Sequence, residues 1–233
     1  MRTIAILPVK SFGAAKQRLA QRLAPGFRQA LAQAMFSDVL TSLRHVAGLD
    51  EVAVVTADEA AGAAALGHRV EVLHDQEEAG QSRAAAVGIR HALASGYERA
   101  LLVPGDTPLL DSGELSSLLA RAAETATTVV VVPDRHGTGT NALLLAPPDA
   151  IAPSFGEGSL ERHVAAAGEA GLACAVEPLP SLVLDVDTPE DLEELSGRLE
   201  RQRGHAPATR GALSQLDRAR GERASARGER ASA

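Results

Sequence analysis

The sequence has few aromatic residues and no tryptophan. Phe, Tyr and Trp together make up 2% of the 233 residues, whereas hydrophobic residues of all kinds make up 45%. A packed core must therefore be built from Ala, Leu and Val. The chain is long enough for one α/β domain of about 200 residues.

Cysteine is nearly absent. Cys174 is the single cysteine of the sequence, which excludes a disulfide framework and a metal site built on several cysteines. Because Cys174 lies in the apolar run LACAVEP, we expect its side chain to be buried as a small hydrophobic group. There is neither an apolar stretch of about 18 residues nor a basic-then-apolar leader, so we expect a cytoplasmic protein that does not enter a membrane.

Basic residues are scarce in the first 200 positions and frequent afterwards. Residues 1–200 carry 15 Lys and Arg against 27 Asp and Glu, a net charge of −12, and residues 201–233 carry eight Arg against three acidic residues, a net charge of +5. An acidic body argues against a nucleic-acid-binding domain. It is compatible with a nucleotide substrate, provided that a cation bridges carboxylates and phosphates.

Large apolar side chains almost disappear in 201–233, where only Leu213 and Leu216 remain and the heptad RGERASA occurs twice in tandem. Such a segment buries too little surface to offset the entropy lost on ordering. We therefore predict a domain over 1–200 followed by a basic, disordered tail. The alternatives are an electrostatic arm, for RNA or for the acidic body, and a helix that packs on a partner.

Eight short apolar runs, several of them continuous rather than alternating, predict β-strands buried on both faces. They lie at residues 3–9, 51–56, 69–73, 100–104, 128–133, 142–146, 172–177 and 182–186. Segments with helical spacing separate most of them, at 26–46, 58–66, 79–95, 111–123, 158–170 and 189–200. This alternation predicts an α/β protein with a mostly parallel open sheet. No helix separates the fifth run from the sixth, so at least one strand should be antiparallel. Ligands of such sheets bind at the carboxyl ends of the strands.

The tripeptide Asp-Thr-Pro follows two apolar runs, at 106–108 and 187–189. Pro suits the first position of a helix and Thr suits its N-cap, so in both segments we expect Thr and Pro to begin the next helix. The Asp then lies one position outside the helix and has no capping role. From the residues alone two interpretations stay open: Asp106 and Asp187 are turn residues, or they are carboxylates that together bind one Mg²⁺.

The first strand leads into the loop VKSFGAAK, and we expect a helix to begin near Ala14. A loop followed by a helix N-terminus is a favourable anion site, and Lys10, Lys16 and Arg18 add three cations within nine residues. The loop is not a Walker A motif, because the ending Gly-Lys-Ser/Thr is absent. Lys16 and Arg18 are explained equally well as solvated charges on a helix face.

A polar, glycine-containing stretch, HGTGTNALLL, precedes and enters the strand expected at 142–146. Thr140 and Asn141 offer a hydroxyl and an amide there, next to glycines that permit close backbone approach. The stretch also suits an ordinary hairpin connection.

A second such stretch, SFGEGSLERH, precedes a helix that we expect to begin near Leu160. Ser159 is expected to be the N-cap of this helix, or to present its hydroxyl to an acidic substrate. We interpret His163 as a surface or structural residue rather than a catalytic one.

Taken together, the segments LPVK, GDTPLL, GTGTNALLL, SFGEGS and DVDTPEDL resemble the 2-phospholactate/phosphoenolpyruvate guanylyltransferases of coenzyme F-420 biosynthesis. The resemblance spans about residues 2–198. It implies a GT-A-like, Rossmann-like nucleotidyltransferase fold and a transfer of GMP from GTP to phosphoenolpyruvate or 2-phospho-L-lactate, with release of pyrophosphate. The Lys-poor composition suggests a GC-rich bacterial genome, and bacterial members are associated with phosphoenolpyruvate.

The resemblance also implies roles for individual residues. The metal-binding carboxylates would be Asp106 and Asp187, with Asp185 as a candidate auxiliary ligand. The GTP phosphates would be faced by Lys10, Lys16 and Arg18, and the phosphorylated acid by Thr140, Gly156 and Ser159, with Asn141 beside them. The sequence departs from the wider superfamily in having one glycine, rather than a Gly-Gly-rich loop, after the first strand.

Other functions also fit the pattern. One alternative is a nucleotidyltransferase with a sugar or molybdopterin acceptor, and another is a nucleotide-binding module without turnover. A homodimer is the default expectation for the oligomeric state.

Overall fold

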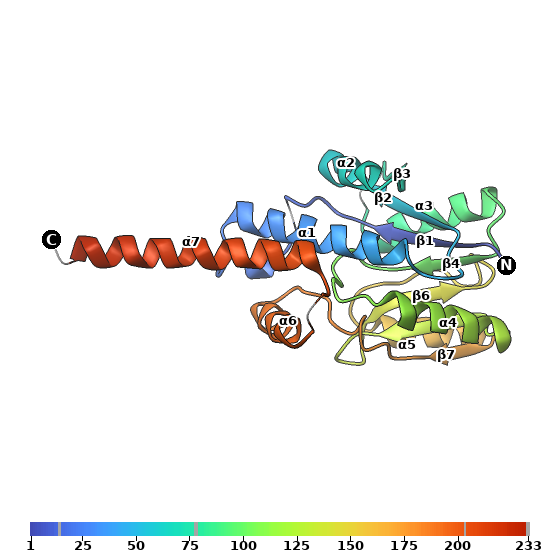
Figure 1. The fold of residues 1–233 in the computed structure, drawn as a ribbon. Helices are drawn as coiled ribbons and strands as arrows, with labels where there is room; N and C mark the ends of the chain where they lie inside the picture. Colours follow the sequence, from blue (N-terminus) through green and yellow to red (C-terminus); the bar gives the residue numbers. More distant parts are fainter. Residues whose placement is uncertain (14, 77–78, 203, 232–233) are drawn as a thin grey trace.

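The structure is a computed structural model, and it describes residues 1–13, 15–76, 79–202 and 204–231. Its strands form one sheet in the order β3-β2-β1-β4-β6-β5-β7 (Figure 1). The strands are β1 Thr3–Pro8, β2 Glu51–Thr56, β3 Glu71–His74, β4 Arg99–Leu102, β5 Val129–Pro133, β6 Thr140–Leu145 and β7 Cys174–Val176. The helices are α1 Pro25–Leu43, α2 Glu59–Gly67, α3 Gln81–Ala94, α4 Ser112–Glu124, α5 Ser159–Glu169, α6 Pro189–Arg201 and α7 Pro207–Ala231, with a 3₁₀ helix at Gln17–Leu19.

The sheet is mostly parallel, as predicted. β1 pairs in parallel with β2 and β4, β2 with β3, and β5 with β7. β6 is antiparallel to both of its neighbours, β4 and β5. Because β6 runs against the others, its first residue lies at the edge of the sheet where β1, β2, β3 and β4 end. The loops after these strands and the start of β6 therefore share one edge.

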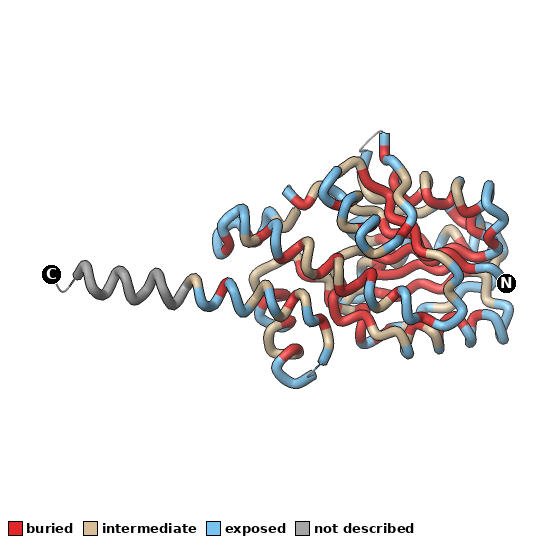
Figure 2. The backbone as a smooth tube through the Cα atoms, turned by 45° about the horizontal axis from the view of Figure 1, so that its top comes forward, coloured by how far each residue is buried: buried red, intermediate tan, exposed pale blue. Residues whose placement is uncertain are grey.

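The core has two layers, one on each face of the sheet. Ile4 and Ile6 of β1 pack with α3 and α5, while Ala5 and Leu7 pack with α1, α2 and α4. This alternation follows from the opposite directions of successive side chains in a strand. A Cβ added at Gly88 of α3 would lie 2.3 Å from Ile6 Cγ2, so the glycine lets α3 approach β1 closely. Figure 2 shows the buried strands between helices whose outer faces are exposed.

Three local expectations were wrong. The run 182–186 is not a strand but an irregular segment that follows a turn at Leu179. Cys174 is exposed rather than buried, because it begins β7 at the edge of the sheet. The helix expected to begin near Ala14, a residue outside the described ranges, does not form: between residues 15 and 24 the only helix is the 3₁₀ helix, and α1 begins at Pro25.

Residues 207–231 form the helix α7 in the segment for which we expected disorder. Asp38 of α1 accepts hydrogen bonds from the backbone N–H groups of Ala208 (3.1 Å) and Thr209 (2.8 Å) and so caps α7. Leu216 joins a cluster of apolar residues from α1 and α6, with Leu213 packed against it. The two leucines and the cap from Asp38 therefore dock the start of α7 on α1.

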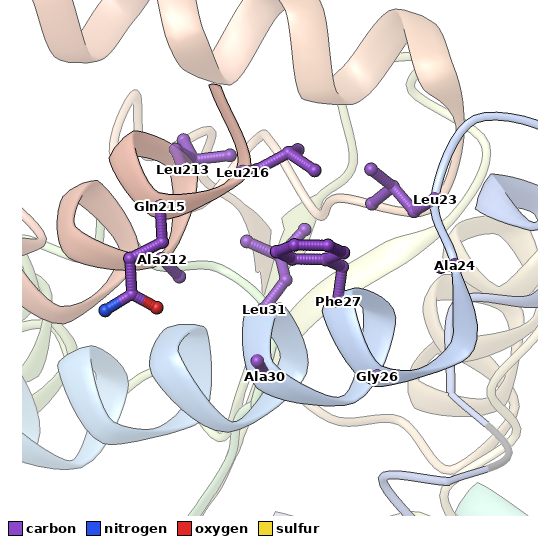
Figure 3. A pocket seen from close by; sticks show the side chains of 10 residues that line it. All are labelled: Leu23, Ala24, Gly26, Phe27, Ala30, Leu31, Ala212, Leu213, Gln215 and Leu216. Carbon is purple, nitrogen blue, oxygen red and sulfur yellow. The ribbon is translucent and has the colours of Figure 1, made fainter. Parts of the chain in front are cut away.

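An apolar cavity of about 360 Å³ lies between the start of α1 and α7. Figure 3 shows Phe27 and Leu31 of α1 on one side of it, with Leu213 and Leu216 of α7 opposite and Leu23 at its end. The docking of α7 is thus not tightly packed.

Candidate active site

A second, larger cavity of about 670 Å³ opens at the carboxyl edge of the sheet. The segments that follow β1, β2, β3 and β4 all contribute to its wall, through Lys10, Ala57, Asp75 and Asp106 respectively, and Asp187 joins them from the segment before α6. This is the edge at which open α/β sheets bind ligands.

Lys16 connects the two Asp-Thr-Pro segments. Its Nζ lies 2.5 Å from Asp106 Oδ2 and 2.9 Å from Asp187 Oδ1, and its side chain is only 5% exposed. Burial alone would lower the pKa of Lys16, but the charges of Asp106 and Asp187 raise it well above its usual value. Burial would likewise raise the pKa of Asp187, but the Lys16 ammonium lowers it. The site therefore holds one ammonium group between two carboxylates.

Lys16 reaches this position through a strained backbone. Its φ is 58° and its ψ is 38°, in the left-handed region, which costs a residue with a Cβ about 1 kcal/mol or more. It is one of four non-glycine residues with positive φ in the described chain. The ion pairs with the two carboxylates offset this strain.

The two carboxylates are carried by different local structures. Asp106 lies in the turn that follows β4, and Asp187 precedes α6 in an irregular segment. The N–H of Val186 donates to the carbonyl of Asp106 at 3.3 Å and so joins the segments. Leu184 and Val186 are buried in the cluster shared with α1 and α6, which leaves the alternate residues, Asp185 and Asp187, to face away from that cluster.

Thr188 is the N-cap of α6, as predicted. Its Oγ1 accepts from the N–H of Asp191, whose side chain in turn accepts from the N–H of Thr188 at 2.7 Å. The same prediction for Thr107 is wrong. α4 begins at Ser112 and is capped by Asp111, and the buried Thr107 hydroxyl has no hydrogen-bond partner among the described residues.

Asn141 and Asp185 lie next to this centre. The Asn141 side-chain amide donates to the carbonyl of Leu182 at 2.7 Å and to Asp185 Oδ1 at 3.3 Å. Burial, together with the charges of Asp106 and Asp187, raises the pKa of Asp185. The amide of Asn141 thus holds the 182–185 segment in place, and its expected contact with substrate stays a prediction.

A buried polar network lies at the start of β6 and α5. His163 Nε2 accepts from the backbone N–H of Ser154 at 2.9 Å, and His163 Nδ1 lies 3.0 Å from Thr140 Oγ1. Ser159 Oγ also donates to Thr140 Oγ1, at 3.1 Å. Burial, together with the neighbouring Arg162 charge, lowers the pKa of His163 to about 4. His163 is therefore neutral at pH 7 and carries its proton on Nδ1, which donates to Thr140.

This network corrects one expectation and extends another. The N-cap of α5 is Gly158, with φ of 69°, and not Ser159, whose side chain is buried and bonds to Thr140 instead. His163 has structural contacts, and it is wholly buried. Its Nδ1 contacts the hydroxyl of Thr140, a residue that we predicted to bind substrate. Gly156 lies next to the network, since its carbonyl accepts from the N–H of Ser159.

The remaining predicted cations, Lys10 and Arg18, are exposed and line the larger cavity. Neither makes an ion pair with another described residue. Unlike Lys16, they are free within the described part of the chain to meet a polyanion.

The donor set fits a hard divalent cation. Asp106 and Asp187 offer carboxylate oxygens on either side of the Lys16 ammonium group. The described residues contain no group of three or more His, Cys, Asp and Glu that could hold a metal ion. Two carboxylates are nevertheless the usual protein share of a Mg²⁺ site that is completed by substrate phosphates and water.

The sequence is similar to one known protein family and to individual members of it. The family described as "Guanylyl transferase CofC like" matches residues 3–203. A phosphoenolpyruvate guanylyltransferase of Conexibacter woesei is 52% identical over 216 residues, which cover 93% of this chain and 97% of the relative. A 2-phospho-L-lactate guanylyltransferase of Methanothermobacter thermautotrophicus is 36% identical over 196 residues, covering 84% of each protein.

A solved structure supports the fold. The chain superimposes with a TM-score of 0.76 on a candidate nucleotide-diphospho-sugar transferase from Desulfovibrio desulfuricans, at 19% identity and with 93% and 96% of the two chains covered. The predicted nucleotidyltransferase fold is thereby confirmed. None of the described helices has the length and apolar character needed to cross a lipid bilayer.

Proposed function

The chain belongs to the family of CofC-like guanylyl transferases, and on this premise we propose that it transfers GMP from GTP to phosphoenolpyruvate, releasing pyrophosphate. The product is enolpyruvoyl-diphospho-5'-guanosine, an intermediate for coenzyme F-420. We choose phosphoenolpyruvate rather than 2-phospho-L-lactate as the acceptor because the relative at 52% identity is named a phosphoenolpyruvate guanylyltransferase. The observation that carries the proposal is the cavity in which Lys16 holds Asp106 and Asp187 together, with Lys10 and Arg18 beside them.

In the reaction, a phosphate oxygen of the acid attacks the α-phosphorus of GTP. A new P–O bond forms there, while the bond between the α-phosphorus and the bridging oxygen breaks and pyrophosphate leaves. The protein supplies position and charge rather than a covalent group. Lys10 and Arg18 bind the triphosphate in the cavity.

Asp106 and Asp187 would hold Mg²⁺, which when bound offsets negative charge on the reacting phosphates. A body with a net charge of −12 over residues 1–200 would otherwise repel two polyanionic substrates. Lys16 holds the two carboxylates together, because its ammonium lies between them. Lys16 would add its own positive charge beside the phosphates bound in the cavity.

We assign binding of the acid to a wall formed by Thr140 and Ser159, which are hydrogen-bonded to each other and are not among the residues that line the larger cavity. Thr140 Oγ1 accepts from both His163 Nδ1 and Ser159 Oγ, which uses both of its lone pairs. Its own proton is thereby left to donate to a further acceptor. We assign this acceptor to an anionic group of the phosphorylated acid, and His163 is the positioning residue that orients the hydroxyl.

The test is a pyrophosphate-release assay with Mg²⁺ and GTP, in which phosphoenolpyruvate and 2-phospho-L-lactate are offered in turn. We expect release that depends on the acid and is faster with phosphoenolpyruvate. Equal rates with both acids would contradict the choice of acceptor. A preference for CTP, or release only with a sugar or molybdopterin acceptor, would contradict the proposed function itself.

A further inference from the structure

The end of β3 carries a carboxylate that the reaction described above does not use. Asp75 follows β3 directly, and its backbone N–H donates to the carbonyl of Thr56 at 3.1 Å. The residue is 8% exposed and lines the larger cavity. Its carboxylate makes no hydrogen bond or ion pair with any other described residue. A carboxylate that lines a cavity and has no partner among the described residues is available to accept hydrogen bonds, so this position indicates a ligand that supplies hydrogen-bond donors.

The sheet order places Asp75 away from the phosphate-binding end of the cavity. β3 and β4 are separated by β2 and β1, and three strand spacings of about 4.8 Å amount to about 14 Å. Lys10 and Asp106 lie at the ends of β1 and β4 in the same cavity. A nucleotide whose phosphates bind near these residues directs its base along the strand ends toward β3.

The chemistry of this end of the cavity matches guanine better than any other base. An ionised carboxylate only accepts hydrogen bonds, and guanine presents two neighbouring donors, N1–H and the N2 amino group. Adenine, cytosine and uracil do not present two adjacent donors on the edge that pairs with another base. Gly80 and Gln81, at the N-terminus of α3, line the same cavity, and N–H groups at a helix N-terminus suit the O6 oxygen of guanine.

Among the described residues, a second acidic side chain nearby is engaged in local structure. Asp58 follows β2, but its Oδ1 accepts from the N–H of Ala61 at 2.8 Å as the N-cap of α2. Thr56 is likewise engaged, since its Oγ1 accepts from the N–H of Asp58. Asp75 is therefore the acidic side chain at this end of the cavity that remains available among the described residues.

We propose that Asp75 selects guanine, by accepting hydrogen bonds from N1–H and from the N2 amino group of GTP. The inference rests on the proposed function, because it places the triphosphate of GTP at Lys10 and Arg18. It assigns Asp75 a contact with the substrate base and no part in the bond-making step.

The experiment compares wild-type protein and Asp75→Asn with GTP, ITP, XTP and ATP in the phosphoenolpyruvate-dependent release of pyrophosphate. ITP lacks the N2 amino group and XTP has an oxygen in its place. For the wild type we expect kcat/KM to be about 10- to 100-fold lower with ITP than with GTP, as for one lost hydrogen bond to a charged group, and negligible turnover of XTP. For Asp75→Asn we expect a loss of similar size with GTP and a gain with XTP, because the amide donates to the oxygen at C2.

Asp149→Asn is the matched control, since Asp149 is exposed in the loop after β6. This variant should have the same kcat/KM as the wild type with all four nucleotides. An Asp75→Asn protein that keeps its preference for GTP over XTP would overturn the inference. If that variant does not fold, as judged by thermal unfolding, the wild type alone decides: equal kcat/KM with GTP and ITP would be the contrary result.

Calorimetric binding of GTP and ITP to the wild type without an acid separates the two proposals. Tighter binding of GTP by about 10-fold or more supports the role of Asp75 even if phosphoenolpyruvate proves not to be the acceptor. Equal affinities, together with normal turnover of phosphoenolpyruvate, would remove the inference and leave the proposed function intact.

Discussion

The two Asp-Thr-Pro segments have the same residues and different structures. At 187–189 the Thr caps α6 and the Pro begins it. At 106–108 the same residues form a turn, and α4 begins later, at Ser112. Both carboxylates nevertheless reach the Lys16 ammonium, within 2.9 Å. Helix capping therefore does not explain why the tripeptide occurs twice, whereas a shared cation does.

The comparison also shows what holds each Asp in place. Asp106 lies in the turn that follows β4, so a strand of the sheet leads to it. Asp187 has no strand behind it, and depends on the buried Leu184 and Val186 and on the hydrogen bond from the Val186 N–H to the Asp106 carbonyl. The second segment is thus positioned partly by the first.

The largest expected effect is on catalysis and should be alike for both segments. Asp106→Asn and Asp187→Asn should each lower kcat/KM for guanylyl transfer by about 1000-fold or more, because a bound ion contributes several kcal/mol to transition-state stabilisation. Pyrophosphate release measures this, with Asp149→Asn as the exposed control. A variant with either Asp replaced that retains near-normal Mg²⁺-dependent turnover would show that the two segments do not form one centre.

As the pH is lowered, the stability contributed by His163, behind the acid-binding wall, should be lost before the stability contributed by the two Asp segments. The folded pKa of His163 is about 4, below its usual 6.5, so the unfolded chain takes up this proton first. The stability contributed by neutral His163 is complete above pH 6.5 and is lost as the pH falls to about 4, by about 3 kcal/mol at most. Asp187, whose pKa is lowered, contributes stability that is lost only below the usual Asp value of about 3.9.

Urea unfolding of the wild type and of His163→Leu between pH 7 and pH 4 checks this assignment. The variant should be less stable at pH 7, because it leaves the Ser154 N–H without its acceptor, but it should lose less stability on acidification. Parallel pH profiles for the two proteins would refute the assignment. His163→Asn, which can still donate to Thr140, should raise the KM for the acid less than His163→Leu does.

Replacing Lys16 should make the stability of the two Asp-Thr-Pro segments depend on the metal ion. Without Mg²⁺ we expect Lys16→Met to lower the free energy of unfolding by about 1–3 kcal/mol, less than for a fully buried pair because the Asp187 side chain is 46% exposed. Added Mg²⁺ should then raise the Tm of the variant more than that of the wild type. Equal responses to Mg²⁺ would mean that the ion and the ammonium do not compete.

The smallest effect concerns the Thr residues and tests the local difference itself. Thr188→Val removes an N-cap and should cost about 1 kcal/mol. Thr107→Val removes a buried hydroxyl that has no partner among the described residues, and should change stability by less than about 0.5 kcal/mol, or increase it. Chemical denaturation of the two variants decides; similar losses in both would mean that Thr107 also has a capping or binding role.

Local patterns were sufficient to predict most of the fold. Continuous apolar runs marked the strands from β1 to β7, and the missing helix between β5 and β6 correctly predicted an antiparallel strand. The run 182–186 misled because apolar residues there pack on α1 and α6 without pairing to a strand. α7 was missed because its cap, Asp38, is 171 residues from Thr209 in the sequence.

The candidate site was predictable in its residues and not in its contacts. Lys10, Lys16, Arg18 and both Asp residues do lie around one cavity, but only tertiary structure shows that Lys16 bridges the carboxylates. Asp75 directly follows the apolar run of β3, and that position was the available signal for it. No local signal distinguishes His163, whose function depends on Ser154 and Thr140 meeting it in space.

The most direct test of a shared cation site is the binding of Mn²⁺, as a paramagnetic substitute for Mg²⁺, to the GTP-bound protein by electron paramagnetic resonance. If Asp106 and Asp187 share one ion, the wild type should bind it in a GTP-dependent way, and Asp106→Asn and Asp187→Asn should each weaken binding by about 10-fold or more. Unchanged Mn²⁺ affinity in either variant would contradict the account, because one of the two Asp-Thr-Pro segments would then lie outside the site.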